Sequence, residues 1–169
     1  MISKVLDFVL EKRVIVNCAR DPYLHRWYLL RSERLGVFIH KFVRSDEDRA
    51  LHDHPWSFLV IPLWGGYIEH SDRPLTLDEW WAGLSDWCES PHELDLPAAA
   101  QQRRIAVRRR VWPLISARYR GTDYRHRVEL IHERPSWSLF IRFTKTREWG
   151  FWLPEGFQLW NKWWQDKCE

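Results

Sequence analysis

The segment His52-Asp53-His54 places two imidazoles with one residue between them, a spacing that could do chemistry. In a β-strand, alternate residues point to the same face, so both rings can face one point while Asp53 faces outward. His126 is a third histidine, on a later strand-like segment. Three converging imidazoles suit Fe, Ni, Zn, Cu or Mn and leave coordination positions open for water and substrate. We therefore predict a site for one divalent metal ion at these histidines.

Candidates for a fourth metal ligand lie on the segments around this pair. Glu69 and His70 follow the Gly65-Gly66 turn, and because neighbouring residues of a strand alternate, one of the two must face inward. His40 lies on the strand-like segment before the pair and can also face inward. We take Glu69 as the candidate fourth ligand, with His40 and His70 as alternatives. The competing interpretation of each is a surface pair or a hydrogen-bonded core histidine.

Strands must position these histidines, and the middle of the chain has the composition of strands. Residues 24–31 and 35–43 are rich in aromatic and β-branched side chains and are joined by a short polar link, as antiparallel neighbours are. Residues 58–63 and 67–70 flank the Gly-Gly turn and form a predicted hairpin. Further strands are predicted at residues 105–107, 111–119, 125–131 and 137–144. Apolar spacing predicts helices at residues 3–12 and 155–166, and a capping box predicts a short helix at 77–84.

The histidine pattern resembles the two motifs of the cupin superfamily. His52, His54 and Gly65 match the histidine pair and the glycine of the first motif, and His126 matches the histidine of the second. The resemblance implies a mainly β fold, a cupin-type jelly-roll barrel over residues 24–144 with short flanking helices at each end of the chain. It also implies a metal ion near one open end of the barrel.

The chain departs from the cupin motifs at two places. Phe58 or Leu59 stands where the first motif has a glutamate, and neither can bind a metal. In the second motif, residues 121–123 read Gly-Thr-Asp in place of Pro-x-Gly, and Leu130 replaces the asparagine. The resemblance therefore implies a site of three histidines without the usual glutamate.

Length and composition favour one compact domain over residues 1–169. A hydrophobic fraction of 45% is enough for one sizeable core, and a net charge of +3 demands no polyanionic partner. Cys18, Cys88 and Cys168 are odd in number and far apart, which argues against a disulfide framework and favours a reducing cytoplasm. Charged residues interrupt the apolar run near the N-terminus, so we predict neither a signal peptide nor a membrane span there.

Aromatic and arginine side chains outline the expected ligand pocket. Trp56, Tyr67 and Tyr119 would form apolar walls, and Arg118 or Arg142 would anchor an acidic group of the substrate. The favoured function is a metal-dependent enzyme acting on a small, acidic organic molecule. An Fe(II) oxygenase is the first choice, and isomerase or hydrolase chemistry at a Zn, Ni or Mn site is the alternative.

Two further functions are compatible with the sequence. A barrel that binds a metabolite without turnover would be a ligand sensor. The arginines at positions 103, 104 and 108–110 could contact nucleic-acid phosphates, although no DNA-reading motif surrounds them. We therefore expect a small-molecule partner, no membrane and no nucleic acid, and leave a monomer and a homodimer open.

Overall fold

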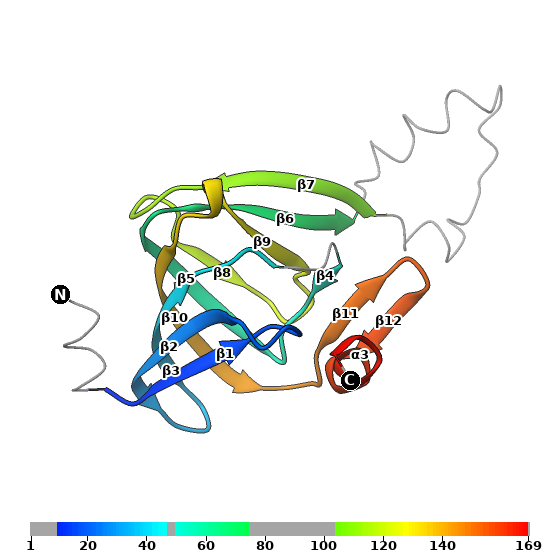
Figure 1. Ribbon diagram of the computed structural model, residues 1–169, viewed down its shortest axis with the longest axis horizontal. Coiled ribbons are helices and arrows are strands. Elements are labelled where there is room, and N and C mark those ends of the chain that lie inside the picture. The colour runs from blue at the N-terminus through cyan, green and yellow to red at the C-terminus, as the bar shows by residue number, and fades with distance from the viewer. Residues whose placement is uncertain (1–9, 47–49, 75–103, 169) are drawn as a thin grey trace, which may run out of the picture.

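Strands dominate the computed structural model, which describes residues 10–46, 50–74 and 104–168 (Figure 1). Its strands are β1 (Lys12–Val16), β2 (Pro22–Arg31), β3 (Gly36–Phe42), β4 (Leu51–His52), β5 (Trp56–Trp64), β6 (Tyr67–Pro74), β7 (Arg104–Val111), β8 (Arg118–Arg120), β9 (His126–Leu130), β10 (Ser136–Lys145), β11 (Gly150–Leu153) and β12 (Gly156–Leu159). A short 3-10 helix, η1 (Ile131–Glu133), joins β9 to β10, and α3 (Trp160–Cys168) follows β12.

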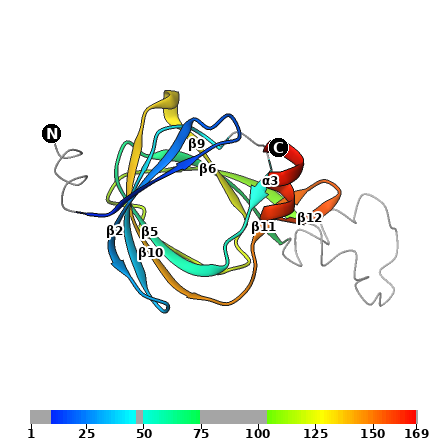
Figure 2. The ribbon, with the colours of Figure 1, turned by 60° about the horizontal axis from the view of Figure 1, so that its bottom comes forward.

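The strands form two six-stranded sheets that face each other across the centre of the molecule (Figure 2). One sheet has the order β1-β2-β3-β10-β5-β8, and the other has the order β12-β11-β4-β9-β6-β7. Neighbouring strands pair antiparallel, for example β10 with β3 and β5, and β6 with β7 and β9. The mainly antiparallel β fold predicted from the sequence is confirmed.

Alternation along the strands produces two apolar clusters between the sheets. Every second residue of β3, β9 and β10 is buried over most of its length. The first sheet contributes Phe38, Phe58, Val60 and Phe140, and the second contributes Tyr67, Val111, Val128 and Leu130. Gly65 and Gly66 turn β5 into β6 with positive φ values of 86° and 67°, which glycine adopts without a steric penalty. The predicted Gly-Gly turn is therefore present, but the predicted hairpin is wrong, because β5 and β6 belong to different sheets and do not pair with each other.

The sheets extend beyond the predicted barrel of residues 24–144 at both ends. Of the helix predicted at residues 3–12, positions 10 and 11 are not helical and Lys12 begins β1, because β1 pairs with β2 from Lys12 opposite Trp27. The remainder of that helix lies outside the described residues. The C-terminal helix is present but begins at Trp160, since Gly156–Leu159 pairs with β11 as β12. The helix predicted at 77–84 also lies outside the described residues.

A disulfide joins Cys18, just after β1, to Cys168 at the end of α3. This corrects the prediction that the widely spaced cysteines do not pair. A sequence separation of 150 residues hides the pairing, because only the folded chain brings α3 beside the turn between β1 and β2. Disulfides are typical of oxidising compartments, so the predicted cytoplasmic location loses the observation on which it rested. Within the described ranges, no helix is long and apolar enough to cross a membrane.

Candidate metal centre

The three predicted histidines meet between the sheets. His52 ends β4, His54 lies on the link to β5, and His126 begins β9 directly opposite His52 in the β4–β9 pair. One ring nitrogen from each histidine lies within 4.8 Å of those of the other two. The Nε2 atoms of His54 and His126 are 2.8 Å apart. The fold therefore brings together, from two separate segments, three groups that could hold one metal ion.

Burial keeps two of these imidazoles neutral. It lowers the pKa of His52 from 6.5 to about 4, with Asp46 opposing the change and His126 adding to it. Burial also holds the pKa of His54 well below its usual value, and the nearby His126 and His52 lower it further. A neutral imidazole presents the lone pair that a metal ion requires. The donor set therefore fits a divalent metal ion that accepts nitrogen ligands.

Glu69 lies behind His126 rather than among the converging nitrogens. It is 2% exposed on β6, which pairs with β9, and its Oε1 lies 3.2 Å from Nδ1 of His126. Its Oε2 accepts a hydrogen bond from Arg120 at 3.3 Å. Burial would raise the pKa of Glu69, but the hydrogen bond and charge of His126 and the charge of Arg120 lower it to about 2. A carboxylate at Nδ1 leaves Nε2 of His126 free to face the other two histidines.

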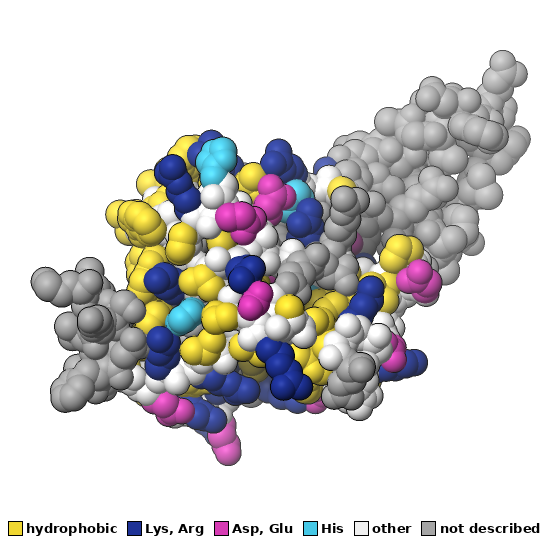
Figure 3. Space-filling model, in the orientation of Figure 1, with side chains coloured by type: hydrophobic (Ala, Val, Ile, Leu, Met, Phe, Trp, Pro, Cys, Tyr) yellow, Lys and Arg dark blue, Asp and Glu magenta, His cyan; other side chains and the backbone are white. Residues whose placement is uncertain are grey.

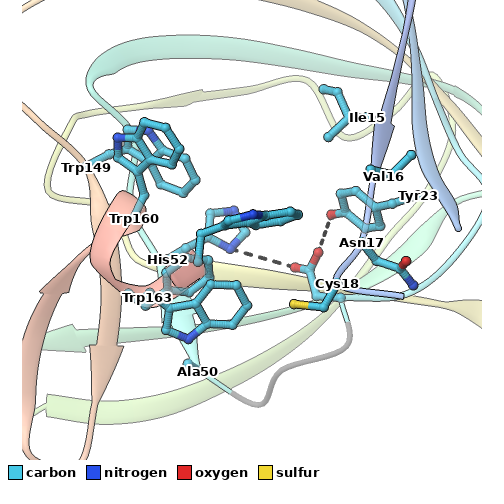
Figure 4. Close-up of a pocket in the computed structure, with 13 residues that line it drawn as sticks. Ile15, Val16, Asn17, Cys18, Tyr23, Ala50, His52, Trp149, Trp160 and Trp163 are labelled. Atoms are coloured by element: carbon cyan, nitrogen blue, oxygen red, sulfur yellow. Dashed lines mark hydrogen bonds and ion pairs between the residues drawn. The ribbon is translucent and has the colours of Figure 1, made fainter. Parts of the chain in front are cut away.

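Asp46 lies beside Nδ1 of His52 as Glu69 lies beside Nδ1 of His126. It was not among the residues predicted for the site. Its Oδ2 lies 3.8 Å from Nδ1 of His52 and accepts a hydrogen bond from the backbone N–H of Val128 at 2.6 Å. The hydroxyl of Tyr23 donates to its other oxygen. In Figure 4, dashed lines join the labelled His52 and Tyr23 to the carboxylate between them. The position of Asp46 in the sequence, a few residues before His52 and His54, could have indicated it as a partner of the histidine pair. Asp46 therefore connects His52 to β2 and β9.

Asp53 is fully buried, which corrects the prediction that it faces outward to the surface. Its carboxylate accepts hydrogen bonds from Arg147 at 2.7 Å, from the backbone N–H of Gly150 at 2.9 Å and from Trp152 Nε1 at 3.0 Å. The prediction failed because β11, a strand that the sequence pattern did not indicate, covers Asp53. Asp53 instead fastens the histidine segment to the start of β11.

A cavity of about 640 Å³ opens beside the histidines. Trp56 and Tyr67, two of the predicted substrate-binding residues, line it, as do all three histidines. A smaller adjoining cavity of about 190 Å³ lies between Trp149 and Trp160 on one side and Ile15, Val16 and Tyr23 on the other (Figure 4). Trp149 directly precedes β11, and Trp160 is the first residue of α3. The C-terminal elements therefore close one side of the space around His52.

Three predicted substrate-binding residues lie away from this cavity. Tyr119 is 61% exposed, and its ring packs on Phe143. The guanidinium of Arg142 donates to backbone carbonyls of residues 32, 33 and 143, and lies 5.5 Å from the ring centroid of Trp56. Arg118, on β8, is also not among the lining residues. Across the β5–β8 pair, Tyr119 lies opposite Leu59 and by alternation faces the side opposite to Arg118, which lies opposite the buried Val60.

The two alternative histidines have different places. His70 pairs with Glu129 across β6 and β9, with 2.6 Å between Nε2 and the carboxylate, and does not line the cavity. His40 is buried and lines the cavity, where its Nε2 accepts a hydrogen bond from Arg26 Nε at 2.9 Å. Neither belongs to the group of converging ligand atoms among the described residues.

Comparison with solved structures identifies the fold. The chain matches no protein-family model and no curated protein. The DMSP lyase DddQ from Ruegeria pomeroyi DSS-3 aligns over 88% of this chain and 64% of its own, with a TM-score of 0.50 and 13% identity. The structure of FeII HppE in complex with substrate aligns over 80% of this chain and 57% of its own, with a TM-score of 0.51 and 9% identity.

A cupin domain from Bordetella pertussis Tohama I aligns over 73% of this chain and 95% of its own, with a TM-score of 0.43 and 14% identity. The chain spans about two thirds of DddQ and somewhat more than half of HppE. At these identities the likeness concerns the fold alone. The likeness to DddQ and HppE, together with the two antiparallel sheets, agrees with the cupin-type fold that the histidine pattern predicted.

Proposed function

We propose that this cupin-fold chain binds one divalent metal ion through His52, His54 and His126 and uses it to transform a small organic molecule. The observation that carries the proposal is the convergence of three imidazole nitrogens within 4.8 Å at the wall of a cavity of about 640 Å³. Ligand pockets of small molecules have volumes of about 300–1,000 Å³, so the space is adequate for such a substrate.

The chain's own groups prepare the site for a metal. Glu69 accepts the Nδ1 proton of His126, and Asp46 faces Nδ1 of His52, so that Nε2 of each ring is the free ligand atom. Three neutral ligands leave the charge of a divalent ion uncompensated and leave coordination positions open. Fe(II) is the favoured ion, with Zn, Ni and Mn as alternatives; when bound, it would supply Lewis-acid or redox chemistry next to the cavity.

The cavity walls favour metal-centred chemistry over general acid–base catalysis by carboxylates. No Asp or Glu is among the described residues that line the larger cavity. Trp56 and Tyr67 contribute aromatic wall, and Phe58 packs against His54 with 4.6 Å between ring centroids. Such walls exclude water from the bound substrate and orient it by shape. We therefore favour an oxygenase-type enzyme, with metal-activated water as the rival chemistry.

The same cavity would serve a ligand sensor, and turnover separates the two functions. A nucleic-acid role has less support. Arg108 on β7 lies 3.7 Å from Glu129, and Arg110 packs over Trp112. On the face that Figure 3 shows, basic side chains are interspersed with acidic and hydrophobic ones rather than gathered in one patch.

Oxygen uptake by the metal-loaded protein tests the proposal. Protein reconstituted with Fe(II) should consume oxygen with at least one member of a panel of small carboxylates and phenols. His54→Ala should abolish uptake, and His70→Ala, which changes a histidine outside the cavity, should not. Turnover of the panel by Zn(II) or Mn(II) protein without oxygen would replace the oxygenase by metal–water chemistry. Tight binding of a panel member without turnover in any metal form would establish a sensor.

A further inference from the structure

Two arginines lie side by side on the cavity wall. Arg13 on β1 is directly opposite Arg26 on β2 in the antiparallel register, and both line the larger cavity. Like charges directly opposite each other destabilise a strand pair. The pair therefore costs folding energy unless an anion lies against it.

The contacts of Arg26 include no carboxylate. Its Nε donates to Nε2 of His40 at 2.9 Å, and its guanidinium lies 5.1 Å from the ring centroid of Phe38. Tyr28 is a further hydrogen-bond partner. Burial lowers the pKa of Arg26, and the charges of Arg13 and Arg142 lower it further. Among residues 10–46, 50–74 and 104–168, neither Arg26 nor Arg13 has an ion-pair partner. A guanidinium in a partly buried position usually pairs with a carboxylate or a phosphate through two parallel hydrogen bonds.

His40 holds the guanidinium of Arg26 in one orientation. Burial, assisted by the charge of Arg26, keeps the pKa of His40 well below its usual value, so the ring is neutral. Because Nε2 accepts from Arg26, the ring proton is on Nδ1. The imidazole is stacked on Phe140 with 4.7 Å between centroids. With Nε engaged by this fixed ring, the terminal nitrogens of Arg26 are the donors that remain for a ligand.

The arginine pair and the three histidines line the same cavity. His40, which accepts a hydrogen bond from Arg26, is stacked on Phe140, and the ring centroid of Phe140 lies 6.4 Å from that of His54. One small molecule can therefore reach both the arginines and the site of the three histidines. Arg142 and Arg118, the anchors expected from the sequence, do not line this cavity.

We propose that Arg26 and Arg13 bind an oxyanion group of the substrate, a carboxylate or a phosphonate, while its other end faces the metal. This inference rests on the proposed function, because it names the substrate class of the same cavity. Arg26 supplies the two-pronged contact, Arg13 adds charge at the rim, and His40 is a positioning residue. Binding of the anion removes the repulsion between the two guanidinium groups.

Calorimetric titration with simple probes tests the inference. Protein loaded with Ni(II) is titrated with ethylphosphonate, propionate and the neutral propanamide, and the metal content of each sample is measured. At least one anion should bind 10-fold or more tightly than propanamide. Arg26→Gln should lower the affinity for that anion by about 10- to 100-fold. Arg26→Lys should have an intermediate affinity, because lysine keeps the charge but lacks the planar guanidinium. The anion that binds more tightly identifies the acid group.

Control variants separate the possible failures. Arg31→Gln changes an exposed arginine of the same strand, paired loosely with Glu11 at 3.7 Å, and should leave anion binding unchanged. Arg13→Gln should lower the affinity for the anion several-fold. Because Arg13 is exposed, this variant still tests the inference if the Arg26 variants fail to fold. Equal anion binding in wild type, Arg26→Gln and Arg13→Gln, with metal content intact, would overturn this inference alone. Absence of metal from the wild type would overturn the proposed function. The anion titration would then be carried out on metal-free protein, where it tests the arginine pair alone.

Discussion

Acidification of the metal-free protein should destabilise it through His52. Burial, opposed by Asp46 and assisted by His126, lowers the pKa of this imidazole from 6.5 to about 4. The unfolded chain therefore takes up the proton before the folded one does. The contribution of His52 to the free energy of unfolding is complete above pH 6.5 and is lost as the pH falls towards 4. Between pH 7 and pH 5, this one group should cost about 2 kcal/mol in the free energy of unfolding.

Urea unfolding of wild type and His52→Asn at pH 7 and pH 5 measures this term. Glu69, with a pKa of about 2, acts at lower pH and does not enter this window. Between pH 7 and pH 5, the free energy of unfolding of the wild type should fall by about 2 kcal/mol more than that of His52→Asn. His132→Asn should follow the wild type, because it changes an exposed residue whose φ of 53° asparagine tolerates. Equal pH dependence of wild type and His52→Asn would refute the argument that burial keeps this ring neutral.

Three further outcomes follow from the contacts around the site. Asp53→Asn leaves Arg147 without its buried counter-charge and should lower the free energy of unfolding by about 3 kcal/mol in urea; a loss below about 1 kcal/mol would contradict the fastening role. Glu69→Gln should weaken metal binding by about 10- to 100-fold in a chelator competition, since the carboxylate orients His126 from behind. Complete loss of metal in that variant would instead identify Glu69 as a direct ligand. Cys18→Ser removes a cross-link across 150 residues and should lower the free energy of unfolding by about 2–5 kcal/mol, and an unchanged urea midpoint would be contrary evidence.

The convergence of the histidines was predictable because it depends on local strand geometry and one long-range pairing. The spacing of His52 and His54 allowed both to face one point, and the strand-like segment around His126 supplied the third ring. The direct opposition of His52 and His126 is the β4–β9 register. The fate of Asp53 was not predictable in the same way, since its partners lie almost one hundred residues later and form a strand that the sequence pattern did not indicate.

The two arginines expected as anchors, Arg118 and Arg142, do not line the larger cavity, whereas Arg13 and Arg26 do. Arg118 and Arg142 lie near His126 or on a neighbouring strand, and this proximity in sequence suggested that one guanidinium enters the cavity. Register places Arg142 opposite Phe58, but its guanidinium donates to the backbone of residues 32 and 33 and does not line the cavity. Arg13 was hidden because the segment before it was interpreted as a helix, and only the pairing of β1 with β2 brings it to Arg26.

The metal content of protein purified without added metal tests the central claim most directly. Wild type should carry about one equivalent of a divalent metal ion, and His52→Ala, His54→Ala and His126→Ala should each carry almost none. His70→Ala, a matched change outside the cavity, should carry as much as the wild type. Metal retained in full by His126→Ala, or absent from wild type even after incubation with Fe(II), Zn(II), Ni(II) and Mn(II), would contradict a metal site formed by the three histidines.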